Sequence, residues 1–442
     1  MIFNSRYLLI SLVLMQPQAA SALGLVDAYN LALKNDAAYQ SALFENEAGQ
    51  QFKVLGRSNL LPVVSASYSF NKNKSEIDFQ NLTSTTTENR DYNSAVASLQ
   101  LRQPLINFDG MARNRLGAKQ TLLSDQQLAV HKQELIVRLF NKYASALYSE
   151  NLLALATAQR DAYAEQKKSN EYMFKRGEST KTDEIESQAK FDLAEAEVIE
   201  AQDALANERD ALSKIIGQGV AALDPLLPEF KVQFMHPASF EEWKAIAEQQ
   251  NPEIIAQRYS LDIAREDVSR NRAGHMPRLD AVASLNQSES DTTNSFNQKA
   301  TTRSIGVQLT VPIYSGGSVN ASTSQAESNL QKAQAELDKK TNEIMVELQK
   351  QYNAAQSSTH RINALDTSVK SAELLIEATR KSVKGGTRTN LDVLNAERQL
   401  YEVKRDLALA RYNYLQSYLN LRKAAGTVGL SDLQVVAGYF GH

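Results

Sequence analysis

The residues that could do chemistry in this 442-residue chain fall into few groups with a recognisable spacing. A Gly-x-x-Thr-x-x-Asp motif occurs twice, as Gly177-Glu-Ser-Thr180-Lys-Thr-Asp183 and Gly386-Thr-Arg-Thr389-Asn-Leu-Asp392. Glycine suits the left-handed residue that ends a helix, and a threonine three residues before an acid is typical of a capping box. The motif therefore predicts a tight turn between two helices, and helix capping alone would explain all six residues.

Other groups of chemical interest have weaker patterns. The stretch Gly217-Gln-Gly219-Val-Ala-Ala222 fits a loose dinucleotide fingerprint, but it follows a helical pattern and runs into Pro225. The five histidines lack the spacing of paired metal ligands. There is no cysteine, which excludes thiolate chemistry and disulfides. We therefore predict no catalytic centre, no cofactor and no metal site.

Composition narrows the class of protein. Hydrophobic residues make up 43% of the chain, enough for a packed core, so wholesale disorder is excluded. The formal net charge is −3, which provides no basic surface for nucleic acid. Beyond the N-terminus, no apolar run is long enough to cross a bilayer as a helix.

The first 22 residues have the layout of an export signal. Arg6 precedes a short apolar run, Tyr7 to Met15, and the segment ends in the small residues Ala20-Ser-Ala22. We predict residues 1–22 as a signal peptide that is cleaved after Ala22, and hence an exported protein.

Landmarks recur along the mature chain at intervals of roughly 210 residues, which indicates an internal repeat. The tip motif is one of them, and the prolines Pro62 and Pro104 correspond to Pro277 and Pro312. We predict a first structural repeat over residues 23–225 and a second over 226–442.

Each repeat is predicted to contain two amphipathic strands. Apolar and polar residues alternate with a period of two, as in Val64, Ala66, Tyr68 and Phe70 of the first strand. The other apolar rows are Ala95, Ala97, Leu99 and Leu101; Leu279, Ala281, Ala283 and Leu285; and Ile305, Val307, Leu309, Val311 and Ile313. Polar stretches at 74–91 and 287–302 are predicted as long solvated loops.

The remaining segments read as helices. A modest helix opens each repeat, at 25–58 and 240–273, and Asn251-Pro252 favours a helix restart in the second. Runs without proline at 111–175 and 318–384 predict very long helices, each followed by a returning helix with apolar residues three and four apart. Such helices must pack as antiparallel coiled-coil hairpins, and the repeated motif lies at their tips.

Four strands with one apolar row each cannot close a membrane barrel, since the smallest outer-membrane barrels have about eight. Three chains would supply twelve. At this point the chain resembles the TolC-like family of outer-membrane channel-tunnel proteins, above all in Gly386-Thr-Arg-Thr-Asn-Leu-Asp-Val-Leu-Asn-Ala396. The resemblance implies a mixed α and β membrane protein. It would be a homotrimer whose 12-stranded outer-membrane barrel, four strands per chain, continues into a long periplasmic α-helical barrel.

The resemblance also implies a function. Family members act as the exit duct of an export system, docked through a periplasmic adaptor onto an inner-membrane transporter. The absence of a lipidation cysteine fits the branch that serves ABC transporters in type I protein secretion. The alternatives are the duct of a multidrug efflux pump and, in a different class, a soluble periplasmic coiled-coil adaptor.

The family's periplasmic gate maps onto residues of both tips. Arg388 matches a latch arginine, and Thr182 and Asp183 match its partners on a neighbouring hairpin. Asp392 matches the first of two aspartates that ring the constriction, and the second ring position is Asn395 in this chain. The resemblance thus implies one carboxylate per chain at the constriction, and weak cation selectivity.

The hairpin tips are also predicted to dock the adaptor. Four of their residues occupy equivalent places in the two repeats, namely Gly177, Thr180, Gly386 and Thr389. A basic cluster near the second tip (Arg380, Lys381, Lys384 and Arg388) has two interpretations: it binds the adaptor, or it complements the negative end of a helix.

Overall fold

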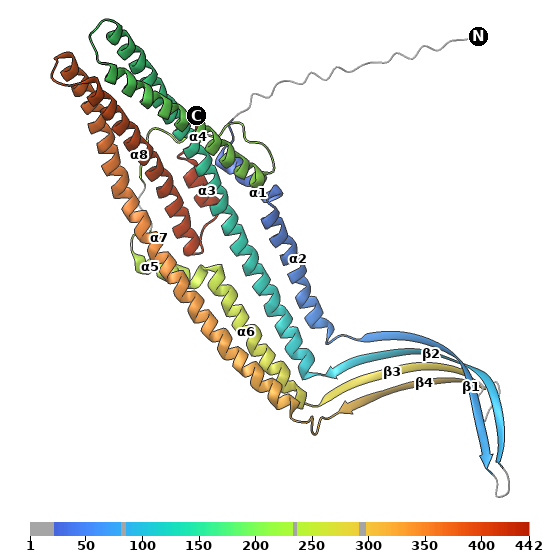
Figure 1. Ribbon diagram of the computed structural model, residues 1–442. Coiled ribbons are helices and arrows are strands. Elements are labelled where there is room, and N and C mark those ends of the chain that lie inside the picture. Colours follow the sequence, from blue (N-terminus) through green and yellow to red (C-terminus); the bar gives the residue numbers. More distant parts are fainter. Residues whose placement is uncertain (1–21, 81–84, 233–236, 291–297, 442) are drawn as a thin grey trace, which may run out of the picture. The chain divides into compact units, whose positions relative to one another are not determined.

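The computed structural model describes residues 22–80, 85–232, 237–290 and 298–441 (Figure 1). The helices are α1 (Leu25–Asn35), α2 (Ala37–Ser58), α3 (Phe108–Lys175), α4 (Lys181–Ile216), α5 (Phe240–Gln250), α6 (Pro252–Arg272), α7 (Ser318–Lys384), α8 (Asn390–Ala424) and α9 (Leu430–Ala437). The strands are β1 (Val63–Gln80), β2 (Thr85–Ile106), β3 (Arg278–Ser290) and β4 (Gln298–Thr310). The predicted signal peptide falls almost wholly on residues 1–21, outside the described residues.

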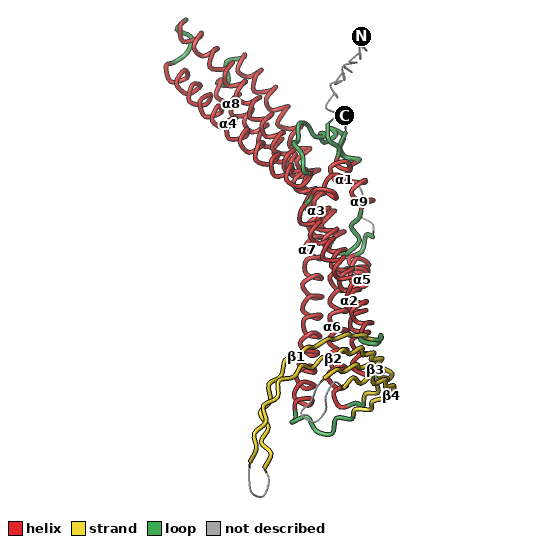
Figure 2. Tube along the Cα trace, turned by 90° about the vertical axis from the view of Figure 1, so that its right-hand side faces the viewer, coloured by secondary structure: helices red, strands yellow, loops and turns green. Residues whose placement is uncertain are grey.

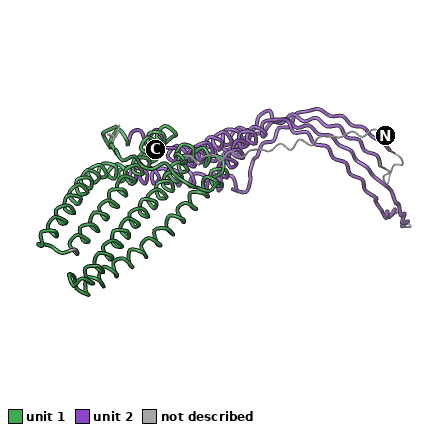
Figure 3. Tube along the Cα trace, turned by 90° about the horizontal axis from the view of Figure 1, so that it is seen from above, with its two compact units in different colours: residues 1–40, 133–243, 348–442 green, residues 41–132, 244–347 purple. Residues whose placement is uncertain are grey.

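The chain forms two compact units, and each draws residues from both halves of the sequence (Figure 3). Unit 1 comprises residues 1–40, 133–243 and 348–442, and unit 2 comprises residues 41–132 and 244–347. The order helix, two strands, long helix and returning helix occurs twice, from α2 to α4 and from α6 to α8. No helix among the described residues is both long and apolar enough to cross a membrane.

Unit 2 holds an antiparallel sheet in the order β1-β2-β3-β4, in which the β1–β2 pair is longer than the β3–β4 pair (Figure 2). Residues directly opposite each other in such a sheet share a face. Val64 lies opposite Leu101, Leu101 opposite Ala283, and Ala283 opposite Ile305. The register therefore brings the predicted apolar rows onto one face, which confirms that prediction.

The other face of the sheet is hydrophilic. The hydroxyl oxygens of Ser67 and Ser98 lie 2.7 Å apart, and so do those of Ser284 and Ser304, so each pair shares a hydrogen bond across neighbouring strands. Such hydroxyl pairs stabilise neighbouring strands on the hydrophilic face of a sheet. One face thus suits an apolar surrounding and the other suits water.

An ion cluster lies on this hydrophilic face, close to the ends of β2 and β3. The Asp280 side chain is fully buried, 2.6 Å from the Arg102 guanidinium and 3.0 Å from that of Arg278. A buried carboxylate needs such partners, because losing its hydration is costly. Since Arg102 belongs to β2 and Asp280 to β3, the cluster ties the strands of one half of the chain to those of the other.

The strands extend into regions that the sequence analysis assigns to loops, so the predicted loops at 74–91 and 287–302 are wrong for their described parts. Cross-strand pairing continues as far as Gln80 with Thr85, and Ser290 with Gln298. Apart from Ile77, Phe79 and Ala300, both faces are polar here, so the apolar alternation that signals a strand fades although the backbone ladder continues. Conversely, Val311 and Ile313 lie beyond the end of β4, where Pro312 has no N–H to donate.

The helices before the strands are interrupted in both halves. The restart at Asn251 is confirmed, because its side chain accepts the N–H groups of Glu253 and Ile254, and Pro252 is the first helical residue. The expected single helix over 25–58 is instead split into α1 and α2 at Asp36. The Asp36 carboxylate accepts the Tyr39 N–H at 2.8 Å and pairs with Arg138 at 2.6 Å, so it acts as a local helix start.

The main core of unit 1 gathers where α1, α3, α4, α8 and α9 meet. Its fully buried members include Leu135, Leu139, Phe140, Leu212 and Leu433. The Tyr143 ring packs edge-on against Phe440, and the Tyr143 hydroxyl donates to the Leu23 carbonyl at 2.9 Å. Thus α3 anchors both the start of the described chain and its C-terminal segment.

Truncation of this core is expected to be costly. Phe140→Ala removes a fully buried ring, so the free energy of unfolding should fall by about 3–5 kcal/mol. Tyr172→Ala, on an exposed position of the same helix, should change it by less than about 0.5 kcal/mol. Guanidinium unfolding of the purified variants measures both, and equal midpoints would contradict this assignment of the core.

Candidate functional site

The candidate site lies in unit 1, where two helical hairpins end side by side (Figure 1). The first hairpin is α3 with α4, and the second is α7 with α8. The seam of each returning helix is packed as predicted, with Val198 and Leu205 of α4 buried, and Val393 and Leu407 of α8. Each hairpin is therefore a packed pair of helices that ends in a defined turn.

The first turn has the predicted geometry. Gly177 adopts a left-handed φ of 74°, and the next N–H, of Glu178, donates to the Met173 carbonyl at 2.9 Å. Thr180 then starts α4, because its hydroxyl accepts the Asp183 N–H at 3.2 Å while its own N–H donates to the Asp183 carboxylate at 3.0 Å. The predicted capping box is thereby confirmed.

The second turn repeats this arrangement. Gly386 has a φ of 77°, and the N–H of Thr387 donates to the Ser382 carbonyl at 3.0 Å. The Asp392 carboxylate accepts the Thr389 N–H at 2.8 Å and the Thr389 hydroxyl at 2.9 Å. Both tip motifs therefore fold as helix–turn–helix junctions that are held by a threonine and an aspartate.

These hydrogen bonds favour the ionised carboxylates. The Thr180 hydroxyl and N–H lower the pKa of Asp183 below its ordinary value, and the Thr389 N–H and hydroxyl lower the pKa of Asp392. A carboxylate whose pKa is lowered in the folded state stabilises the turn fully when the pH is above the ordinary carboxyl pKa. That stabilisation is lost as the pH falls through the folded-state pKa.

Acid is therefore expected to loosen both turns. Below about pH 4 the amide hydrogens of Thr180 and Thr389 should lose protection from exchange, after correction for the intrinsic exchange rate. In a variant with Asp183→Asn and Asp392→Asn this pH dependence should disappear, because an amide still caps a helix but does not titrate. Hydrogen exchange read by mass spectrometry at pH 3 and pH 6 measures it, and equal protection in the unchanged protein would refute the expectation.

Arg388 lies in the second turn. Its guanidinium donates to the Thr379 hydroxyl of its own hairpin at 3.3 Å, and its charge contributes to the lowered pKa of Asp392. Thr182 is exposed beside Asp183 on the first tip. Within one chain, the described contacts of Arg388 and Asp183 thus stay inside their own hairpins. The latch between Arg388 and a neighbouring hairpin stays a prediction.

A cavity of about 170 Å³ joins the two tips. Its lining includes Asn170 and Asp183 from the first hairpin and Thr389 and Leu394 from the second. The Asn170 amide donates to the Asp183 carbonyl at 3.2 Å. Tip residues that are about two hundred positions apart in sequence therefore share one site.

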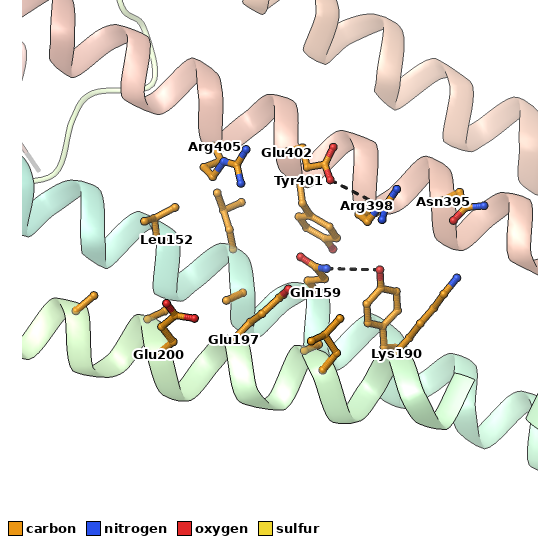
Figure 4. Close-up of a pocket in the computed structure, with 17 residues that line it drawn as sticks. Leu152, Gln159, Lys190, Glu197, Glu200, Asn395, Arg398, Tyr401, Glu402 and Arg405 are labelled. Atoms are coloured by element: carbon orange, nitrogen blue, oxygen red, sulfur yellow. Dashed lines mark hydrogen bonds and ion pairs between the residues drawn. The ribbon is translucent and has the colours of Figure 1, made fainter. Parts of the chain in front are cut away.

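A larger cavity of about 620 Å³ opens between α3, α4 and α8 (Figure 4). Asn395 lines it from α8, where Arg398 pairs with Glu402 at 3.6 Å. Tyr163 lines it from α3, and burial raises the pKa of this tyrosine. Asn395 alone among these cavity residues was predicted as a site residue, because residues on three different helices share no sequence spacing.

The basic cluster near the second tip is partly neutralised within its own hairpin. Arg380 pairs with Glu397 and Lys381 with Glu377, both at 2.7 Å. Lys384 and Arg388 are exposed. Two of the four cations therefore have local partners, which favours a role at the helix end over a dedicated binding patch. Throughout the described residues, no three His, Asp or Glu side chains lie where they could hold a metal ion together.

The comparisons with known proteins agree with this architecture. The family profile described as outer membrane efflux protein matches residues 28–218 and 244–427. The chain is 42% identical to the alkaline protease secretion protein AprF of Pseudomonas aeruginosa, over 97% of this chain and 89% of that protein. It is 39% identical to the proteases secretion protein PrtF of Dickeya chrysanthemi, over 96% and 92%. With the outer membrane protein TolC of Vibrio cholerae the identity is 30%, over 95% and 94%.

Solved structures show the same fold. The outer membrane protein VceC from Vibrio cholerae superposes with a TM-score of 0.78 at 18% identity, covering 91% of this chain and 96% of that one. The Campylobacter jejuni CmeC outer membrane channel has a TM-score of 0.78 at 17% identity, covering 100% and 98%. The paired strands and long hairpins described above are thus the fold of known outer-membrane channels.

Proposed function

The chain belongs to the outer membrane efflux protein family, and from that membership we propose that three copies form the exit duct of a type I protein-secretion system. The protein resides in the outer membrane and extends into the periplasm. The observation that carries the proposal is the sheet of unit 2, a single layer whose apolar rows are aligned in register on one face.

A single sheet of this kind needs lipid on one side and water on the other. Ile305 and Val307 are 90% and 70% exposed, and the Ser67–Ser98 and Ser284–Ser304 hydroxyl pairs lie on the opposite face. Three chains would contribute twelve strands, enough to close a barrel with its apolar face outward and its hydroxyl face around an aqueous lumen. The homotrimer and its contact with outer-membrane lipid follow from that closure.

The hairpins would form the periplasmic part of the duct. Each chain supplies two similar tips, so a trimer supplies six, which matches a six-fold ring of adaptor subunits. We place the docking sites at Gly177, Thr180, Gly386 and Thr389, and the gate at Arg388, Thr182, Asp183, Asp392 and Asn395. The two-repeat organisation, 23–225 and 226–442, accounts for the doubling of the tips.

The duct would work without chemistry of its own. An inner-membrane ABC transporter would supply the energy, and a periplasmic adaptor would couple it to the duct. The tip carboxylates are already engaged in helix caps. The long hairpins of the three chains would enclose the channel through which the cargo passes. We therefore assign conduction, and no enzymatic step, to this chain.

The cargo follows from the two relatives that are named for protease secretion, which are about 40% identical to this chain. We infer a secreted protein as the cargo. A small-molecule efflux duct is the competing assignment, since the family profile carries that name.

Deleting the gene and fractionating the culture tests the proposal. Proteins that are normally released by an ABC exporter should disappear from the medium, while sensitivity to detergents and dyes changes little. The reverse pattern would favour efflux. The detergent-extracted protein should have about three times the mass of the mature chain, and a water-soluble monomer would instead support the periplasmic adaptor.

A further inference from the structure

The sheet of unit 2 has two free edges. Among the described strands, β1 and β4 each have a neighbour on one side only. These edges contain no proline or bulge, and on the edge strands Tyr68 and Ile305 are 70% and 90% exposed. Long edge strands with exposed apolar side chains associate with another strand unless something covers them.

We propose that β4 of one copy pairs antiparallel with β1 of the next copy in one defined register, with Gln308 directly opposite Ser67. This inference rests on the trimeric barrel proposed above and specifies its subunit interface. The same register places Val311 opposite Val64, Leu309 opposite Ala66, Val307 opposite Tyr68, and Ile305 opposite Phe70.

The apolar rows narrow the choice of register. Residues opposite each other share a face, so an odd-numbered apolar residue of β4 must oppose an even-numbered apolar residue of β1. The permitted registers therefore differ by steps of two residues. The proposed register matches all four apolar residues of β1 with apolar residues of the β4 row. The shift that brings Ile313 opposite Val64 does so as well, but it uses Ile313, which lies beyond Pro312, and the opposite shift matches only three.

Each neighbouring register places an apolar residue opposite a cation. A shift of two residues one way places Arg303 opposite Phe70, and a shift the other way places Ile305 opposite Lys72. Each of the three registers sets one pair of like charges opposite each other, so charge repulsion does not separate them. Lys299 gains an opposite-charge neighbour in two of the three registers, Glu76 in the proposed one and Asp78 in the one that pairs Ile305 with Lys72.

The proposed register also pairs the polar residues on the hydrophilic faces of the two strands. The register sets Thr310 opposite Ser65 and Ser304 opposite Asn71, so the polar row continues across the subunit boundary. Hydroxyl pairs of this kind already link β1 with β2 and β3 with β4 inside the chain. The boundary would then be indistinguishable in chemistry from the interior of the sheet.

Barrel geometry gives an independent check. Following directly opposite residues from Val64 leads through Leu101, Ala283 and Ile305 to Phe70 of the next copy, six residues further along β1. With a rise of ~3.3 Å per residue and strands ~4.8 Å apart, that displacement corresponds to a strand tilt of about 46°. Barrels have tilts of about 35–45°, so the value lies at the upper limit of the range. The register that reaches Lys72 would need about 54°, which the tilt excludes, whereas the register that reaches Tyr68 would need about 35° and is disfavoured by its poorer apolar match.

The absence of cysteine makes the register measurable. A disulfide needs Cα atoms about 4.4–6.8 Å apart, which directly opposite residues meet and diagonal neighbours at about 7–8 Å do not. The test combines Gln308→Cys with Ser65→Cys, Ser67→Cys or Ser69→Cys, in the full-length protein in isolated outer membranes under a mild oxidant. All three cysteine pairs lie on the hydrophilic face, so they differ in register and not in the direction of their side chains.

We expect the Ser67 pair to cross-link at least tenfold faster than the others and to give covalent dimers and trimers on non-reducing gels. Faster cross-linking of the Ser65 or Ser69 pair would overturn the register. If no pair cross-links while the extracted particle still has three times the chain mass, the β1–β4 contact itself is wrong and the trimer stands. A monomeric particle would instead refute the proposed function.

Discussion

Replacing Val307 by lysine is expected to remove the protein from the outer membrane. Val307 lies in the middle of the apolar row of β4, between Ile305 and Leu309, and its side chain is 70% exposed in the isolated chain. A lysine on the lipid face of a barrel costs about 2–4 kcal/mol near the bilayer midplane. A trimer would carry three of them, so the assembled fraction should fall by orders of magnitude.

Gln308→Lys is the matched control for this change. Gln308 is the next residue of the same strand, so its side chain points to the opposite, hydrophilic face. A lysine there would meet the aqueous lumen, and assembly should stay close to normal. Immunoblots of outer-membrane fractions measure both variants. Normal assembly of Val307→Lys with loss of Gln308→Lys would show that the faces are assigned the wrong way round.

Replacing Arg388 by serine is expected to open the closed channel and to raise its conductance in planar bilayers more than tenfold. In the proposed trimer the guanidinium links one tip to Thr182 and Asp183 of a neighbouring hairpin. An exposed charged contact contributes about 1 kcal/mol at most, so three per trimer shift the open–closed equilibrium by roughly a hundredfold. The effect should shrink at high salt, because screening already weakens the contact.

Two controls separate the latch from general damage to the tip. Lys384→Ser removes an equally exposed cation near the same turn and should leave the conductance unchanged. Asp183→Ala should open the channel, whereas Thr180→Ala, which loses the threonine side of the same capping box, should only loosen the turn. Unchanged conductance in both Arg388→Ser and Asp183→Ala would refute the latch.

Much of the local structure was predictable because short-range chemistry decides it. Glycine at φ 74° and 77° with a threonine–aspartate cap specifies each tip, and Asn251 with Pro252 specifies a helix start. The apolar rows of the strands could be read from alternation alone. The family resemblance extended these patterns to a channel, and the match to the outer membrane efflux protein family agrees with it.

Two predictions failed, those of the strand lengths and of the single first helix, and each failure has a physical reason. Residues such as Lys74 and Asp91 continue the β1–β2 ladder although both faces are polar there, so nothing in the alternation marks them as strand. The break at Asp36 was missed although aspartate is a common helix start and its carboxylate accepts the Tyr39 N–H; it also pairs with Arg138, about a hundred positions away, and local spacing does not reveal such a partner.

The sequence by itself thus determined the helix caps at both tips and the two-faced character of each strand, and it predicts an export signal at residues 1–22. These features depend on residues within a few positions of one another. Only the tertiary structure decided that Leu101 faces Ala283, that Asp280 is buried between Arg102 and Arg278, and that Asp183 and Thr389 share a cavity. Those contacts join segments far apart in the chain, and packing selects them over many alternatives that satisfy the same local pattern.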